Sequence, residues 1–394
     1  MTSIQDLDVE RARAETPGCA DVVHFNNAGS ALPPAVVLDT VLGHLREEAH
    51  LGGYEATAAV SEKLDAVYAS VARLLNAEAD DIAITENATR SWQAVFYSFP
   101  FGPGDRILTS QAEYASNVIS FLQLKRRTGV EVEVIGDDES GQLDVAELRR
   151  RIGDDVKLIA VSHVPTQGGL VNPAEEIGEV AEQAGIPFLL DACQSAGQLD
   201  LDVRRLKCDA LSATGRKYVR GPRGTGFLYV HPKLRARLEP AMLDLHSASW
   251  TSPSEYTVDP TAKRFEVWER NTALVLGLGA AVDYALEWGL PAIDARVSAL
   301  ANTLRERLGE LPGVQVHDQG ARKCGIVTFS LEGTPAADVK RALTAARINT
   351  SVSSSTSAQF DFTARKLPDL VRASAHYYNT EDEIDLLVRE VAKL

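Results

Sequence analysis

The chain has 394 residues, which is long enough to bury a large core and to form two domains or one large domain with an appendage. Its composition of 45% hydrophobic and 24% charged residues, with a net charge of −15, is typical of a globular protein and argues against nucleic acid as a partner. It has no run of 18 apolar residues, and its acidic start, MTSIQDLDVERARAE, lacks the layout of a signal peptide. We therefore expect no membrane contact and a cytoplasmic location.

Short apolar runs alternate with amphipathic stretches between about residues 60 and 230. The strand-like runs are DIAIT, DRILTS, VEVEVIG, VKLIAVSHV, IPFLLDA, CDALSAT and GTGFLYV. Between the fourth and fifth runs lies NPAEEIGEVAEQAG, whose early Pro and final Gly are typical of a crossover helix. This alternation predicts an α/β fold with a mostly parallel sheet flanked by helices.

The pattern changes after ERNTALVLGLGAAVDYALEWG. A helix, a strand and two further helices are predicted there, in PAIDARVSALANTLRERLGEL, GIVTFSL, PAADVKRALTAAR and EDEIDLLVREVAKL. They indicate a smaller C-terminal α+β domain over residues 276–394, after a large domain over residues 51–275. We expect residues 1–50 to form an N-terminal segment that packs with the small domain.

Cysteine usage argues against a disulfide framework. The four cysteines are Cys19, Cys193, Cys208 and Cys324, and no two of them form a CxxC pair. A zinc site is not indicated either, and we expect no metal. We interpret the four residues as reduced thiols.

Asp191 is the first candidate site residue, because ligands of open α/β sheets gather past the carboxyl ends of the strands. It ends the run IPFLLDA, and Gln194 follows three residues later. A carboxylate directly after a buried strand is costly to leave unpaired, so a cationic group should face it. For the aspartate alone, a helix N-cap is the commoner explanation.

Lys217 is the second candidate, and it lies 26 residues after Asp191, just beyond the next predicted strand. If the two strands lie close in the sheet, both side chains enter one crevice. The nearby Arg216, Arg220 and Arg223 should lower the pKa of this amine, which would make it nucleophilic enough for a Schiff base. A basic patch on the surface is the alternative.

The sequence DACQSAG followed by TGRKYVRGPRGTGFLYV resembles the class V family of fold-type I pyridoxal-phosphate (PLP) enzymes. This family includes cysteine desulfurases, isopenicillin-epimerase-like proteins and the C–S lyase of ergothioneine synthesis. The resemblance extends to HFNNAGSALPP, TSQAEYASNV, SHVPTQGGLVNP and LVRASAHYYNTEDEID. It implies a large PLP-binding domain with a mostly parallel seven-stranded sheet, a small C-terminal α+β domain, an amino-acid substrate and a homodimer.

The resemblance also implies roles for the residues after the predicted strands. Lys217 would bind PLP covalently and shuttle a proton at the substrate carbon, and Asp191 would pair with the protonated pyridine nitrogen. Gln194 would donate to the phenolic oxygen of the cofactor, with Thr166 or Gln167 assisting.

Further roles fall on the start of a predicted helix and on the C-terminal region. Ala88 and Thr89 would hold the phosphate, with Thr214 as a second candidate, although Thr89 could simply begin a helix. Tyr114 takes the position of the stacking histidine of desulfurases, and a core aromatic is its alternative; a tyrosine stacks but does not shuttle protons at neutral pH. Arg372 would grip the substrate carboxylate, unless it is a surface arginine at a helix end.

One loop departs from the desulfurase pattern. Desulfurases attack the substrate sulfur with a loop cysteine, whereas the corresponding stretch here, INTSVSSSTSAQFDF, contains none. Cys193 and Cys324 look like small buried residues and are poor substitutes. The family threonine that reaches the neighbouring subunit's phosphate falls near Glu269, which leaves that role open.

The expected activity is therefore a PLP-dependent C–S β-lyase acting on an S-substituted cysteine or cysteine sulfoxide, with release of pyruvate and ammonia. The phrases GGYEA, RFEVWERN and SVSSS resemble the epimerase-like and lyase branch. A class V aminotransferase or an amino-acid epimerase is the alternative, and a cysteine desulfurase is less favoured. A binding protein without turnover is disfavoured because Asp191, Gln194 and Lys217 are all present.

Overall fold

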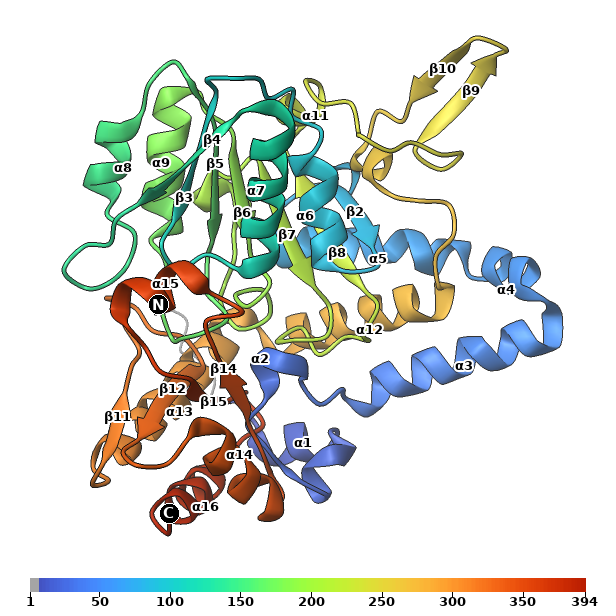
Figure 1. Ribbon diagram of the computed structural model, residues 1–394. Coiled ribbons are helices and arrows are strands. Elements are labelled where there is room, and N and C mark those ends of the chain that lie inside the picture. Colours follow the sequence, from blue (N-terminus) through green and yellow to red (C-terminus); the bar gives the residue numbers. More distant parts are fainter. Residues whose placement is uncertain (1–6) are drawn as a thin grey trace, which may run out of the picture.

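The computed structural model describes residues 7–394, and a seven-stranded sheet forms its centre (Figure 1). Its strands are β2 (Ile82–Thr85), β3 (Arg106–Ser110), β4 (Glu131–Ile135), β5 (Val156–Ser162), β6 (Phe188–Asp191), β7 (Ala210–Thr214) and β8 (Gly226–Val230). The order is β2-β8-β7-β6-β5-β3-β4, and β8 runs antiparallel to both of its neighbours while the other adjacent pairs are parallel. The seven predicted strands and the mostly parallel sheet are confirmed.

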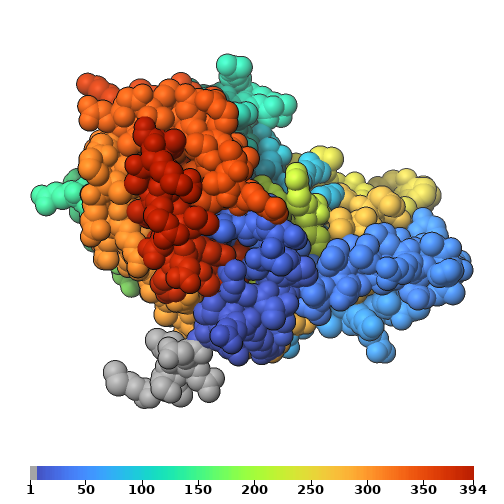
Figure 2. All heavy atoms as spheres, turned by 90° about the horizontal axis from the view of Figure 1, so that it is seen from below, coloured from blue at the N-terminus to red at the C-terminus, as the bar shows by residue number. Residues whose placement is uncertain are grey.

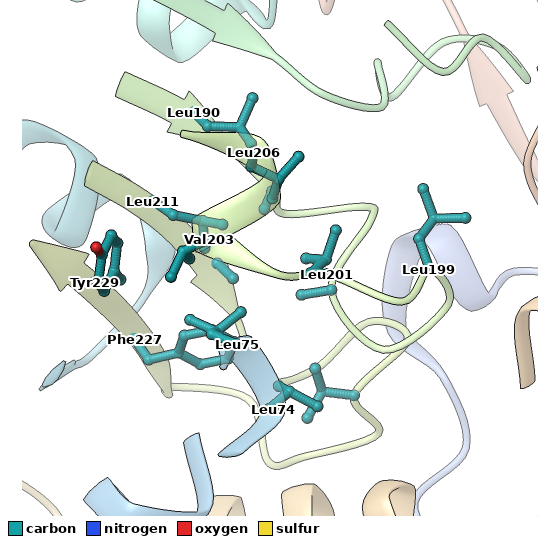
Figure 3. Packing of buried hydrophobic residues seen from close by; sticks show 14 of the residues in the cluster. Leu74, Leu75, Leu190, Leu199, Leu201, Val203, Leu206, Leu211, Phe227 and Tyr229 are labelled. Atoms are coloured by element: carbon teal, nitrogen blue, oxygen red, sulfur yellow. The ribbon is translucent and has the colours of Figure 1, made fainter. Parts of the chain in front are cut away.

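Helices cover both faces of this sheet. They are α5 (Ser61–Leu75), α6 (Ala88–Phe96), α7 (Ala115–Thr128), α8 (Val145–Arg151), α9 (Ala174–Ala184), α10 (Val203–Leu206) and α11 (Pro232–Arg235). Successive strand residues point to opposite faces, so Leu189 packs with the core under α6 and α7 and Leu190 with the core under α5 and α9. Figure 3 shows the second core, where Leu74 and Leu75 of α5 approach Phe227. The predicted crossover helix is α9.

A second, antiparallel sheet lies in the C-terminal part. Its strands are β11 (Val314–Val316), β12 (Ile326–Leu331), β14 (Ser351–Ser353) and β15 (Leu370–Ser374), in the order β11-β12-β15-β14. The helices of this part are α13 (Leu290–Gly309), α14 (Ala336–Ala345), α15 (Gln359–Arg365) and α16 (Glu381–Val391). Arg372 is buried in β15, a central strand, so its interpretation as a surface arginine at a helix end is wrong.

The N-terminal segment touches both parts of the molecule (Figure 2). After α1 (Val9–Ala14), strand β1 (Val23–His24) pairs in parallel with β13 (Ile348–Asn349), and α2 (Asn27–Ser30) follows. The next helices, α3 (Ala35–Leu51) and α4 (Gly53–Ala59), extend along the other side, where α3 packs on α12 (Thr272–Trp288). Helix α3 runs through residue 51 and α12 runs through residue 275, so no break in the chain marks either limit. The predicted domain limits at 50/51 and 275/276 stay a prediction.

Helices α12 and α13 meet at Gly289, whose φ of 83° suits the sharp turn between them. Among residues 7–394, no single helix has both the length and the apolar composition needed to cross a membrane. The two helices meet that criterion only when counted together, and they are bent by 80°.

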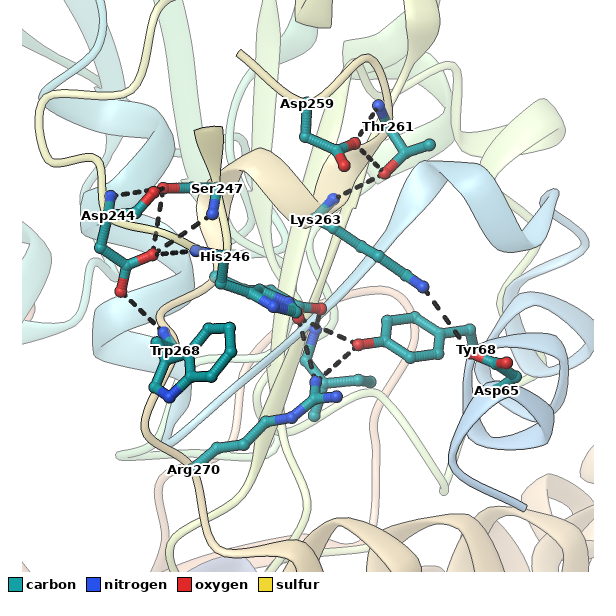
Figure 4. A network of polar contacts seen from close by, with 12 residues as sticks. Asp65, Tyr68, Asp244, His246, Ser247, Asp259, Thr261, Lys263, Trp268 and Arg270 are labelled. Atoms are coloured by element: carbon teal, nitrogen blue, oxygen red, sulfur yellow. Dashed lines mark hydrogen bonds and ion pairs between the residues drawn. The ribbon is translucent and has the colours of Figure 1, made fainter. Parts of the chain in front are cut away.

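The buried carboxylate of Glu266 fixes the segment that precedes α12, and its partners Tyr68, His246 and Arg270 are labelled in Figure 4. Glu266 accepts hydrogen bonds from the Tyr68 hydroxyl at 2.9 Å, the Ile84 amide at 2.7 Å and Arg270 Nη1 at 3.0 Å, and it pairs with His246 Nε2 at 2.6 Å. Before this segment, β10 (Glu255–Val258) forms a hairpin with β9 (Ala248–Ser252).

The contact between α9 and α10 gives a stability prediction. A Cβ added to Gly178 would lie 2.0 Å from the carbonyl oxygen of Leu206, so Gly178→Ala should lower the free energy of unfolding by about 1–3 kcal/mol. Denaturant unfolding measures this loss. Gly309→Ala is the control, because its Cβ meets nothing within 4 Å; equal effects of the two changes would contradict the close packing.

Candidate functional site

A cavity of about 340 Å³ lies where β5, β6 and β7 end, beside the start of α6. Its walls are formed by Asn87, Ala88, Thr89, Tyr114, Ser162, Val164, Thr166, Asp191, Cys193, Gln194, Thr214, Arg216, Lys217 and Gly224. This volume falls within the range of roughly 300–1,000 Å³ found for small-ligand pockets. Apart from Arg372 and Gln167, the site residues predicted from the sequence all line this one cavity.

Lys217 enters the cavity from the loop that follows β7. Asp191 at the end of β6 pairs with Ser212 of β7, so the two strands are neighbours and both side chains reach the same space. Burial and, to a smaller extent, the adjacent charge of Arg216 lower the pKa of Lys217 to about 8. Of the three arginines predicted to lower this pKa, only Arg216 does so. Arg223 is exposed, and the side chain of Arg220 binds elsewhere.

Asp191 is held by the protein on both of its oxygens. Its Oδ1 accepts from the amide of Cys193 at 2.9 Å, and its Oδ2 accepts from Asn117 Nδ2 at 3.0 Å. The next helix, α10, is capped by Asp202 instead, so the interpretation of Asp191 as a helix N-cap is wrong. The buried carboxylate thus remains available to a cation in the cavity.

The N-terminus of α6 forms one end of the cavity. Asn87 caps this helix by accepting from the Arg90 amide at 3.0 Å, and Ala88 and Thr89 are its first two residues. A Cβ on Gly226 of β8 would lie 2.8 Å from the amide nitrogen of Ala88, so a glycine is needed for β8 to approach this closely. An exposed helix start of this kind suits an anionic group such as a phosphate.

Thr166 links the two sheets at the cavity wall. Its hydroxyl accepts from Gln194 Nε2 at 3.1 Å and from Arg372 Nη1 at 2.9 Å, and its carbonyl accepts from the same Nη1 at 2.8 Å. Arg372 therefore lies directly behind Thr166, while its buried Nε has no partner among the described residues. Burial lowers the pKa of Arg372.

Two predicted donors are already engaged within the protein. Gln194 Nε2 also donates to the Ala28 carbonyl at 3.0 Å, so both of its hydrogens are used, and its buried Oε1 has no partner among the described residues. Thr214 donates its hydroxyl proton to the Thr225 carbonyl at 3.2 Å. Each of these two side chains must give up one of these hydrogen bonds before it can donate to a ligand.

Tyr114 precedes α7 and lines the cavity, where it is only partly buried. The serine-rich loop after β14 is fixed beside it, because the Ala115 amide donates to the Ser357 carbonyl at 3.0 Å. Gln111 Nε2 also donates to the Phe360 carbonyl at 2.7 Å. The tyrosine ring and the loop thus share one side of the site.

The sequence interpretation missed several residues of the site. Cys193, expected to be buried, is half-buried and lines the cavity; burial and the charge of Asp191 raise its pKa to about 12. Glu113 and Asn117 lie behind Asp191, although only Tyr114 was given a role in that motif. Their spacing of four residues at the junction of a strand and a helix was the signal that could have shown them.

The chain was compared with known proteins. The sequence model of the family described as Aminotransferase class-V matches residues 22–387. A cysteine desulfurase of Serratia proteamaculans is 30% identical, and a probable cysteine desulfurase of Methanothermobacter thermautotrophicus is 29% identical. The alignments cover 98% of this chain and 98% of the first relative, and 97% of this chain and 96% of the second.

Solved structures extend the comparison. The apo structure of a cysteine desulfurase from Thermococcus onnurineus NA1 has a TM-score of 0.92 and 27% identity, over 100% of this chain and 99% of that one. The cystine C–S lyase C-DES, in complex with its reaction product cysteine persulfide, has a TM-score of 0.87 and 25% identity, over 96% of this chain and 99% of that one.

The burial of Lys217 predicts a pH dependence. Burial disfavours the charged amine, so in the chain freed of cofactor Lys217 should lose its proton near pH 8, below the ~10.4 of a solvated lysine. Its labelling by a small amine-selective reagent, followed by peptide mass spectrometry, should therefore rise with a midpoint near pH 8. Exposed Lys340 is the control in the same sample, because its labelling shows how the reagent reacts with a solvated lysine at each pH. A Lys217 midpoint near ~10.4 would contradict the prediction.

Proposed function

Because the chain belongs to the class V aminotransferase family of PLP enzymes, we propose that it is a C–S β-lyase. Its substrate is an S-substituted cysteine or a cysteine sulfoxide, and its products are pyruvate and ammonia. The sulfur leaves with the substituent of the substrate. The observation that carries the proposal is the serine-rich loop beside Tyr114, which contains hydroxyl groups and no thiol.

The residues of the cavity fit PLP. The start of α6 at Ala88 and Thr89 suits the phosphate, and the buried carboxylate of Asp191 suits a protonated ring nitrogen. Lys217 Nζ makes no ion pair or hydrogen bond within residues 7–394, which leaves this amine free to bind the cofactor covalently. The ring of Tyr114 suits stacking on the cofactor. When bound, PLP supplies an electron sink for the charge that develops at the substrate Cα.

Different side chains of the protein carry out proton transfer and substrate binding. Lys217 takes the proton from the substrate Cα, because its lowered pKa favours the neutral amine that can act as a base. Arg372 binds the substrate carboxylate through the guanidinium nitrogens that Thr166 does not hold. Loss of the sulfur substituent from Cβ completes the elimination, and hydrolysis gives one pyruvate and one ammonia for each thiol or sulfenic acid released.

Two observations support the lyase over a desulfurase, even though the relatives named above are mainly desulfurases. The loop is held to α7 through Ser357, the following helix α15 is held to Gln111 through Phe360, and the loop contains no cysteine. The solved cystine C–S lyase C-DES covers nearly the whole chain at 25% identity. A class V aminotransferase or an epimerase on the same scaffold is the alternative, since each begins with loss of the Cα proton.

A substrate panel tests this assignment. The protein is incubated with cysteine, with an S-substituted cysteine sulfoxide, and with an amino donor plus a 2-oxoacid, while pyruvate, sulfide, alanine and new amino acid are followed. We expect pyruvate from the sulfoxide at least ~10-fold faster than from cysteine, because elimination depends on the leaving group.

Two variants serve as controls for the panel. Lys217→Ala should abolish pyruvate release, and Cys193→Ala should leave it within about threefold of the wild type, since a thiol with a pKa raised to about 12 is a weak nucleophile. New amino acid without pyruvate would replace the lyase with an aminotransferase. Alanine with sulfur bound to the protein would overturn the argument from the loop.

We also propose that the protein is a homodimer whose interface includes α3, α4 and the β9–β10 hairpin, which lie on one side of the molecule (Figure 1). Large apolar side chains are exposed there, among them Tyr54 at 76%, Trp250 at 74% and Trp268 at 55%. Tyr54 and Trp268 also line a second cavity of about 530 Å³, together with Glu269, the residue near which the family's cross-subunit threonine falls.

Sedimentation velocity at micromolar concentration tests the homodimer. The wild type should sediment as a dimer, and Tyr54→Asp should shift it toward the monomer because it places a charge in an apolar interface. Ile119→Asp is the matched control, since Ile119 of α7 is 65% exposed outside this surface. A fully active wild-type monomer would contradict the proposal.

A further inference from the structure

Glu113 is a fully buried carboxylate between β3 and α7, behind the cavity wall. It accepts from the Ser162 amide at 2.9 Å, the Ser162 hydroxyl at 2.5 Å and the Tyr114 amide at 2.8 Å. It also accepts from Asn117 Nδ2 at 2.9 Å and from the Thr109 hydroxyl at 3.2 Å. Five donors converge on one acid, so its orientation is fixed by β3, β5 and α7 together.

Asn117 connects this acid to Asp191. Its Nδ2 donates to Glu113 Oε1 at 2.9 Å and to Asp191 Oδ2 at 3.0 Å, so each of the two amide hydrogens serves one carboxylate. The opposite orientation of the amide would place its oxygen against two carboxylate oxygens, which cannot donate when ionised. The two acids therefore hold the amide, and the amide holds the Asp191 carboxylate in one direction.

A second buried acid beside Asp191 has a free-energy cost that a neutral side chain would avoid. Burial and the charge of Asp191 both raise the pKa of Glu113, to about 7, while its hydrogen-bond donors oppose the shift. A glutamine could accept several of the same hydrogen bonds without a charge. A buried acid kept at this cost suggests a use at Asp191 beyond fixing the start of α7.

We propose that Glu113 is a positioning residue for the cofactor, acting through Asn117 on Asp191. It holds the Asp191 carboxylate toward the ring nitrogen, and in its ionised form it places a second negative charge behind that carboxylate. A second negative charge at this place favours a cation in the cavity, so it stabilises the protonated form of the ring nitrogen that faces Asp191. The inference rests on the pairing of Asp191 with the ring nitrogen in the proposed function.

The test compares two ligands that differ only at the ring nitrogen. Cofactor-free protein is titrated with PLP and with a carbocyclic analogue in which C–H replaces that nitrogen, and the affinity ratio is measured. Glu113→Gln should weaken PLP binding about tenfold, the equivalent of one pKa unit, and change binding of the analogue by no more than about twofold. Glu113→Asp, which keeps the charge, should retain most of the wild-type ratio.

Two further variants make the result decisive. Glu113→Ala removes the charge and leaves room for water beside the freed donors, so it should show the same selective loss even if Glu113→Gln does not fold. Glu266→Gln is the matched control, because it neutralises another fully buried, multiply bonded glutamate that does not line the cavity, and it should leave the ratio unchanged.

Equal loss of both ligands in Glu113→Gln and Glu113→Ala would show a purely structural role and overturn the inference, as would no loss of either. A wild-type protein that binds both ligands equally would also overturn it, because Asp191 would then not meet the ring nitrogen. This test measures binding and not turnover. An aminotransferase result in the substrate panel would therefore contradict the proposed lyase and leave the inference about Glu113 unaffected.

Discussion

The buried guanidinium of Arg220 is the contact on which the position of Lys217 depends. The Arg220 amide donates to the Lys217 carbonyl at 2.9 Å, and the φ of Arg220 is 64°, in the left-handed region. Its side chain donates to the Leu32 carbonyl at 2.9 Å and to the Tyr377 hydroxyl at 2.6 Å, and it lies 4.6 Å from the ring centre of Tyr378. Aromatic faces and neutral acceptors thus stabilise a buried cation and tie the lysine loop to the N-terminal segment and the C-terminal part.

From this anchor, the cavity is assembled out of segments that are distant in sequence. Gln194, beyond β6, donates to the carbonyl of Ala28 in the N-terminal segment. Thr166, beyond β5, accepts from Arg372 of the second sheet. The cavity is therefore closed by polar contacts between separate segments of the chain, and the N-terminal segment is also held by the pairing of β1 with β13.

The central sheet could be predicted from the sequence because buried parallel strands are continuous apolar runs with helices between them. The same rule placed Asp191 and Lys217 at neighbouring strand ends. The strand that carries Arg372 was missed although Pro368 and Asp369 precede it, because its run of five residues, LVRAS, is short and has an arginine at its centre. The link between Glu113 and Asp191 was also missed, since it depends on how β3, β5 and β6 lie side by side, and spacing along the chain does not contain that information.

Burial acts in opposite directions on the two potential nucleophiles of the cavity. Removing water disfavours the charged form of each group, so it lowers the pKa of the Lys217 amine to about 8 and raises that of the Cys193 thiol to about 12. A neutral amine is the reactive form of lysine, whereas a neutral thiol is the unreactive form of cysteine. The environment that activates Lys217 therefore suppresses Cys193. Sulfur transfer to that thiol is disfavoured by the same desolvation, which supports the proposal that the sulfur leaves with the substrate's own substituent.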